Sequence, residues 1–167
     1  GVIQRFINGF FGAQFNESAF FNQAQFNQSV EFSSSEFDKD SYFSWCKFNQ
    51  SADFGGARFG MDAIFDQSYL KSADFSSTSI SNDLSLKGTE IEYLSLNNAQ
   101  IGEIVLRPWK NIGHMEYDEM AYQSLLSSFK NRNLPDEANE CYYDYRNARR
   151  ATLNFLYQPA DYALMLF

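Results

Sequence analysis

"FNESAFFNQAQFNQSVEFSSSEF", from Phe15 to Phe37, carries aromatic residues at a regular rhythm. One subset of its phenylalanines is separated by steps that alternate between six and five residues. The residue two places before each member of this subset is usually small, and the neighbours on either side are mostly polar. Side chains two residues apart in an extended segment point to the same face. The stretch therefore predicts a backbone with one large and one small side chain turned inward on each short side.

The rhythm continues far beyond this stretch, with aliphatic residues gradually replacing phenylalanine. After Phe65 the step becomes five residues, with one more six-residue step before Leu86. The predicted core phenylalanines are Phe15, Phe21, Phe26, Phe32, Phe37, Phe43, Phe48, Phe54, Phe59, Phe65 and Phe75. Further on, Leu84, Leu94 and Ile104 take the small position while the adjacent centres shrink to leucine. This exchange conserves volume, as a close-packed interior requires.

The segments "ADFGGARF", "AQFNQSVEF" and "SADFSSTSI" resemble the pentapeptide-repeat family in its phenylalanine-rich form. The resemblance covers residues 6–107. It implies a mainly β fold, a right-handed quadrilateral β-helix of about 4.5 to 5 coils, in which each pentapeptide forms one side. The six-residue steps depart from the family pattern and predict a wider coil of 22 residues. The additional residues are Ser18, Ser29, Asp40, Ser51 and Asp62, which we interpret as corner bulges.

A wider coil also predicts which side chains stack on the outside. Phe20, Tyr42 and Ile64 each precede a core position and are spaced by one such coil, so they should form an exposed apolar column. Trp45 and Tyr69 should lie near neighbouring edges. An exposed apolar column can mark an interface. The alternative is that another part of this chain covers it.

The pattern changes after Arg107, which predicts a repeat domain over residues 1–107 and a helical domain over residues 108–167. "DEMAYQSLLSSFKNRN" places apolar side chains on one helical face, and Pro135 opens a second helix with acidic residues early and arginines late. In the second helix the predicted apolar stripe is Ala138, Cys141, Tyr142, Tyr145 and Ala148. We expect the two helices to form a hairpin that caps the open end of the β-helix or, alternatively, binds a partner.

The helical region has a resemblance of its own. Residues 109–150, with the elements "AYQSLLSSF" and "EANECYYDYR", resemble the segment that follows pentapeptide repeats in some prokaryotic membrane proteins, including channel-like ones. In those proteins transmembrane helices come next. The resemblance therefore implies a soluble part of a membrane-attached protein, with a membrane domain beyond Phe167.

The residues that usually carry chemistry are sparse in this sequence. His114 is the single histidine and has no neighbouring cysteine with which to bind a metal ion. Cys46 and Cys141 lie far apart and are expected to be buried thiols, which favours a reducing, cytoplasmic compartment. We therefore expect no catalytic, metal or cofactor site and no enzymatic activity. The net charge of −8 argues against direct binding of nucleic acid.

Two kinds of function remain after these exclusions. The first is a scaffold for protein–protein interaction, whose partner the sequence does not identify and which could be a second copy in a homodimer. The second follows from the family, because some pentapeptide-repeat proteins resemble duplex DNA and bind type II topoisomerases such as DNA gyrase. A DNA mimic needs a continuous negative face. The outward column formed by Gln14, Glu36 and Arg58 mixes charges instead.

Overall fold

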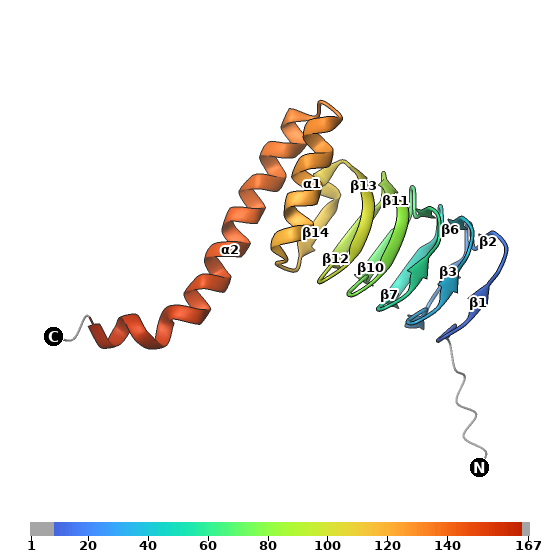
Figure 1. Cartoon of the computed structure of the whole chain (residues 1–167), viewed down its shortest axis with the longest axis horizontal. Helices are drawn as coiled ribbons and strands as arrows, with labels where there is room; N and C mark the ends of the chain where they lie inside the picture. Colours follow the sequence, from blue (N-terminus) through green and yellow to red (C-terminus); the bar gives the residue numbers. More distant parts are fainter. Residues whose placement is uncertain (1–8, 165–167) are drawn as a thin grey trace, which may run out of the picture.

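The computed structural model describes the backbone of residues 9–164 and the side chains of residues 9–153. The chain forms a parallel β-solenoid of about five turns, followed by two helices (Figure 1). The mainly β solenoid predicted from the sequence is confirmed. The predicted domain limits at residues 1 and 167 lie outside the described residues.

The elements follow the order of the repeat. The strands are β1 (Gln14–Phe15), β2 (Ala19–Phe20), β3 (Gln25–Phe26), β4 (Val30–Glu31), β5 (Glu36–Phe37), β6 (Ser41–Tyr42), β7 (Lys47–Asp53), β8 (Arg58–Phe59), β9 (Ala63–Ile64), β10 (Tyr69–Asp74), β11 (Ser79–Lys87), β12 (Glu90–Ser95), β13 (Gln100–Arg107) and β14 (Ile112–Met115). The helices are the 3₁₀ turn η1 (Trp109–Asn111) and the α-helices α1 (Glu119–Asn131) and α2 (Pro135–Leu164).

Successive turns stack through two parallel sheets. An eight-stranded sheet contains β1, β5, β8, β11, β9, β6, β2 and β13, and a six-stranded sheet contains β14, β12, β10, β7, β3 and β4. In the first turns the paired residues are 22 apart, as Gln14 and Glu36 are. Between β11 and β13 the separation falls to 20, as for Leu84 and Ile104, and between β12 and β14 it is 21, as for Ile91 and Ile112. Register shifts between β7 and β10 and between β11 and β13 remove one residue each, so the coils shorten as predicted.

The interior consists of ladders in which each ring lies over a ring of the next coil. Phe54 stacks on Phe32 at 5.0 Å and on Phe75 at 4.9 Å between ring centroids, with planes tilted by no more than 6°. Neighbouring ladders meet edge to face, as Phe43 and Phe54 do at 5.5 Å. Both geometries are favourable for aromatic quadrupoles. The same ring order therefore satisfies contacts along the solenoid axis and across the core.

Burial follows position along the solenoid. The predicted core phenylalanines from Phe32 to Phe75 are buried, whereas Phe15, Phe21 and Phe26 are half-buried and pack against the core. Among the described residues, these three belong to the first coil, which has a neighbouring coil on one side only. The replacements Leu84, Leu94 and Ile104 are buried.

Left-handed residues turn the corner after every second side. They are Gly12, Gln23, Ser34, Trp45, Gly56, Gln67, Ser77, Gly88 and Asn98, with φ between 57° and 68°. In most of these turns an amide closes a bond to the carbonyl three residues earlier, as the Ala57 amide does to Phe54 at 2.9 Å, which is the pattern of a type II turn. The glycines of "FGGARFG" fit tight corners, because a Cβ on Gly60 would lie 2.8 Å from the Asp38 carbonyl oxygen.

Buried hydroxyl groups tie neighbouring coils together at the small inward positions. The hydroxyls of Ser68, Thr78 and Thr89 donate to the carbonyls of Phe43, Phe54 and Phe65 at 2.6, 2.9 and 2.7 Å. Each bond reaches a carbonyl of the preceding coil. These three hydroxyl groups are therefore satisfied inside the core, whereas the buried Ser41 hydroxyl makes no hydrogen bond to any described residue.

The helices close the C-terminal end of the solenoid. Asp118 caps α1 by accepting the Ala121 amide at 2.9 Å. Tyr122, Leu125 and Phe129 of α1 are buried in the same apolar cluster as the solenoid core, and α2 packs against the outer side of α1 (Figure 1). The expected antiparallel hairpin thus lies on the end of the solenoid.

Two features of this end differ from the sequence-based expectation. β14 continues the solenoid past the predicted boundary at residue 107, because Ile112 and Met115 pair with Ile91 and Leu94. Tyr142, predicted to lie on the buried stripe of α2, is exposed. α2 continues well beyond α1 and leads away from the solenoid (Figure 1). No helix of the described chain is long and apolar enough to cross a membrane.

The ring ladders generate a stability prediction. Phe54 is fully buried between Phe32 and Phe75, so Phe54→Ala should lower the free energy of unfolding by about 3–5 kcal/mol, as large-to-small core changes do. Urea unfolding followed by circular dichroism measures this loss. Phe26→Ala removes a half-buried ring from the first described coil and should cost clearly less. If Phe54→Ala and Phe26→Ala lowered the free energy of unfolding equally, the ring ladder would not be the main source of stability.

Candidate interaction surface

One side of the solenoid carries an exposed aromatic column. This side is built by β2, β6, β9 and the C-terminal parts of β11 and β13. Phe20 pairs in register with Tyr42, and Tyr42 pairs with Ile64. The rings of Phe20 and Tyr42 stack at 4.9 Å with planes 2° apart. We call Phe20, Tyr42 and Ile64 the aromatic column.

Exposure varies along the column. The Phe20 side chain is 70% exposed, Tyr42 and Ile64 are half-buried, and the next residues in register, Ser85 and Val105, are buried. The column is therefore accessible on the N-terminal coils and closed near the helical end. For the accessible coils, no described part of the chain provides the cover considered in the sequence analysis.

An acidic row runs beside the aromatic column. Asp40, Asp62 and Asp83 stack on consecutive coils, because a carboxylate oxygen of each accepts the amide of the next. The Asp62 amide lies 3.2 Å from Asp40 Oδ1, and the Asp83 amide lies 3.1 Å from Asp62 Oδ1. Glu103 follows Asp83 in register but pairs with Arg132 at 3.0 Å. We call Asp40, Asp62 and Asp83 the acidic row.

The titration behaviour of this side reflects its negative potential. The charge of Asp40, together with slight burial and the phenol–carboxylate hydrogen bond, raises the pKa of Tyr42. Burial raises the pKa of Asp83, and the charges of Asp62 and Glu103 add to this effect. The hydrogen bond from Arg132 lowers the pKa of Glu103 instead. The pKa of Asp83 thus shifts in the opposite direction from that of Glu103, although the charges of Arg132 and Lys87 lower it in part.

Two further exposed apolar residues stand at the corners of this side. Trp45 follows the column at one corner and is 63% exposed, and Met61 precedes the acidic row at the other. Trp45 has φ 61°, a conformation that Gly12, Gly56 and Gly88 adopt at comparable corners. A bulky residue in the left-handed region costs about 1–2 kcal/mol. Gln23 and Gln67 adopt a similar φ, so several corners bear this cost, and at Trp45 it falls on an exposed aromatic side chain.

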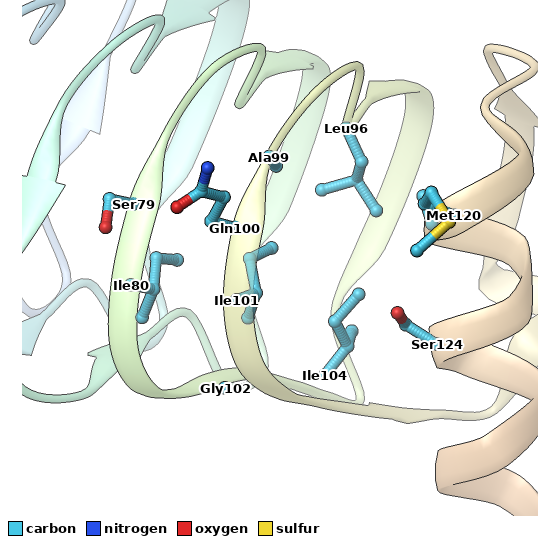
Figure 2. Close-up of a pocket in the computed structure, with 11 residues that line it drawn as sticks. Ser79, Ile80, Leu96, Ala99, Gln100, Ile101, Gly102, Ile104, Met120 and Ser124 are labelled. Carbon is cyan, nitrogen blue, oxygen red and sulfur yellow. The ribbon is translucent and has the colours of Figure 1, made fainter.

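A separate groove lies where α1 meets the last coil (Figure 2). Its cavity of about 460 Å³ has Ile80, Ile101 and Ile104 on the solenoid side and Met120 and Ser124 on α1. The residues that line it carry hydroxyl, amide and apolar groups and no ionisable side chain. The groove could hold a ligand by its shape and by hydrogen bonds, but its lining contains no acid or base for catalysis.

The other candidate residues from the sequence occupy separate places. His114 is exposed on β14, where its ring lies 5.3 Å from that of Tyr93. Cys46 and Cys141 are buried free thiols, and burial raises the pKa of both, that of Cys141 to about 12. Within residues 9–153, no group of three or more His, Cys, Asp or Glu side chains is arranged to hold a metal ion.

The stacking of Phe20, Tyr42 and Ile64 is predictable from the sequence, but the surroundings of the column are predictable only in part. From the sequence, Asp40 and Asp62 are expected to be corner bulges at the six-residue steps, and Trp45 is expected near a neighbouring edge. The signal for the acidic row was present, because Asp40, Asp62 and Asp83 each stand three residues before a core position. The identity of residue 45 as a tryptophan does not predict its left-handed backbone.

Compared with protein-family models, with curated proteins and with solved structures, the chain gives no match in any of the three comparisons.

The strained corner generates a stability prediction. Trp45→Gly should be more stable than Trp45→Ala by about 1 kcal/mol, because both remove the ring but only glycine adopts φ 61° without a clash. Thermal unfolding of the two variants measures this difference. At Ser41, an inward position with ordinary backbone, the same pair of substitutions should favour alanine. A Trp45→Ala variant as stable as Trp45→Gly would contradict the assignment of strain to this corner.

Proposed function

We propose that this chain is a non-catalytic scaffold that binds a protein partner on the aromatic column. The observation that carries the proposal is the stacking of the 70% exposed Phe20 ring on Tyr42. Aromatic side chains on a rigid surface lose little conformational entropy on binding and dominate the energy of many interfaces. The parallel coils beneath hold the column in fixed register, so its shape is set before a partner arrives.

Several features of the surface support this proposal. Of the exposed large apolar residues on the solenoid, Phe20, Trp45 and Met61 belong to or border the same side. The charged groups that flank the column provide a polar rim, which interfaces usually have around an apolar centre. The groove of Figure 2 is a weaker candidate, because its polar groups are uncharged and no exposed aromatic residue lines it.

We further propose that the chain is a member of the pentapeptide-repeat family acting in the cytoplasm. The five-residue steps and the left-handed corners after every second side support the family, whereas the six-residue steps depart from its pattern. The two buried thiols fit a reducing compartment. The resemblance of residues 109–150 adds attachment to a membrane domain. Two apolar runs of about 20 residues in the sequence after Phe167 would support that attachment.

A photo-crosslinking amino acid can test the binding surface directly. Placed at Phe20, it should capture the partner in living cells, because this side chain points away from the core. The matched control is Tyr93, which is also exposed but lies on the six-stranded sheet. The captured band should disappear when Tyr42→Ala and Trp45→Gly are added. Capture at Tyr93 but not at Phe20 would place the binding surface elsewhere.

A second candidate is a DNA mimic that binds a type II topoisomerase such as DNA gyrase. One observation favours it, namely the stacked acidic row, which is a continuous line of negative charge over three coils. If this candidate holds, the protein should inhibit gyrase supercoiling or protect the enzyme, and Asp40→Asn with Asp62→Asn should abolish the effect. The absence of any effect of the unmodified protein in a supercoiling assay removes this candidate.

A further inference from the structure

The acidic row carries negative charge that no ion pair among the described residues neutralises, although the nearby charges of Arg132 and Lys87 act on Asp83. No ion pair joins Asp40, Asp62 or Asp83 to a lysine or arginine within residues 9–153. The carboxylates on either side differ, because Asp66 pairs with Lys87 at 3.5 Å and Glu103 pairs with Arg132. The nearest cation in sequence is Lys39, which is exposed at the corner before Asp40. A partner of the aromatic column therefore meets a negative rim.

The same chain carries a complementary surface on α2. Tyr143, Arg146, Arg150 and Leu153 are exposed, and their spacing of three, four and three residues places them on one helical face. Among the described ion pairs, none involves Arg146 or Arg150. Arg146 lies 5.9 Å from the centre of the Tyr142 ring. We call Tyr143, Arg146, Arg150 and Leu153 the basic stripe.

The two surfaces have a similar repeat, and the basic stripe is long enough to cover the accessible column. The accessible column spans two coil spacings of about 4.8 Å, or about 10 Å, while the basic stripe covers ten residues at 1.5 Å, or about 15 Å. One helical turn of about 5.4 Å is close to the coil spacing, so successive turns of a helix can follow successive coils. In an extended strand, side chains on one face repeat every ~6.6 Å. This repeat differs more from the coil spacing, so a strand would follow fewer successive coils than a helix.

We propose that the basic stripe of α2 docks along the aromatic column of a second copy of this chain, with Arg146 and Arg150 facing the acidic row. This inference rests on the proposed function of the column as a binding surface. Within one molecule the contact is not made, because α2 leaves from the C-terminal end of the solenoid and leads away from β2 and β6 (Figure 1). A second molecule has no such restriction.

Charge decides which surface of the second copy fits. Two aromatic columns placed face to face with their acidic rows in line would bring Asp40 and Asp62 of one copy close to the same residues of the other. Like charges across an interface oppose association. The basic stripe instead supplies apolar side chains at its ends and cations between them. Opposite charges favour this pairing over column on column.

The test is sedimentation velocity of the full chain with two charge-reversal variants. One variant carries Asp40→Lys with Asp62→Lys, and the other carries Arg146→Glu with Arg150→Glu. The unmodified protein should self-associate at about 50 mM salt and at least tenfold more weakly at about 500 mM, where charges are screened. Each variant alone should be monomeric. An equimolar mixture should associate again, because every contact between unlike variants then joins opposite charges.

Controls and contrary outcomes are defined by the same measurement. Glu31→Lys with Glu90→Lys reverses two exposed charges on the six-stranded sheet and should leave association unchanged. Circular dichroism checks that every variant is folded. A monomeric unmodified protein, or a mixture of variants that stays monomeric, overturns the inference.

The outcome also separates this inference from the proposed function. If association survives Arg146→Glu with Arg150→Glu but is lost in Phe20→Ala with Tyr42→Ala, the column binds something other than the basic stripe. If the protein is monomeric and crosslinking at Phe20 still captures a different protein, the column remains a binding surface and the self-association is rejected. If the protein is monomeric and crosslinking at Phe20 captures no protein, the aromatic column is rejected as a binding surface.

Discussion

The stacking of one ring on the next, at the spacing of hydrogen-bonded strands, is the constraint on which this structure depends. Rings in the Phe32, Phe54 and Phe75 ladder lie 4.9–5.0 Å apart, close to the distance between paired strands. Any coil that drifted in register would break backbone bonds and ring contacts together. The interior therefore forces equivalent residues of successive coils into line, and outward side chains are aligned as a consequence.

This alignment explains why the repeat produces an ordered surface although no separate interaction fixes each outward residue. An outward residue is stacked because the inward residue beside it is stacked. Phe20 and Tyr42 are parallel to within 2° although they are outside the core, because Phe21 and Phe43 behind them are parallel to within 4°. Three residues stacked on adjacent coils are enough to form a continuous strip. Rigidity of this kind lowers the entropic cost of binding.

The fold could be predicted from the sequence because its periodicity is one-dimensional. Each core position is set by its neighbours along the chain, so counting residues from Phe15 onward predicted the paired positions and the shortening coils. Two features were not predicted from the sequence. β14 lies after Pro108 and Trp109, where a short 3₁₀ turn interrupts the counting. The exposure of Tyr142 depends on the angle at which α2 crosses α1, and helical spacing alone does not specify that angle.

The candidate surface was predicted only in part, and the reason lies in the six-residue step itself. Asp40 and Asp62 are the additional residues of that step, and Asp83 occupies the same place before Leu86. An additional residue at a corner leaves an amide that needs a partner, and the aspartate of the preceding coil accepts it. Hydrogen bonding thus places carboxylates beside the column for a structural reason. These aspartates make no ion pair with a cation among the described residues. The residues that satisfy the corner amides therefore also favour a cationic partner beside the column.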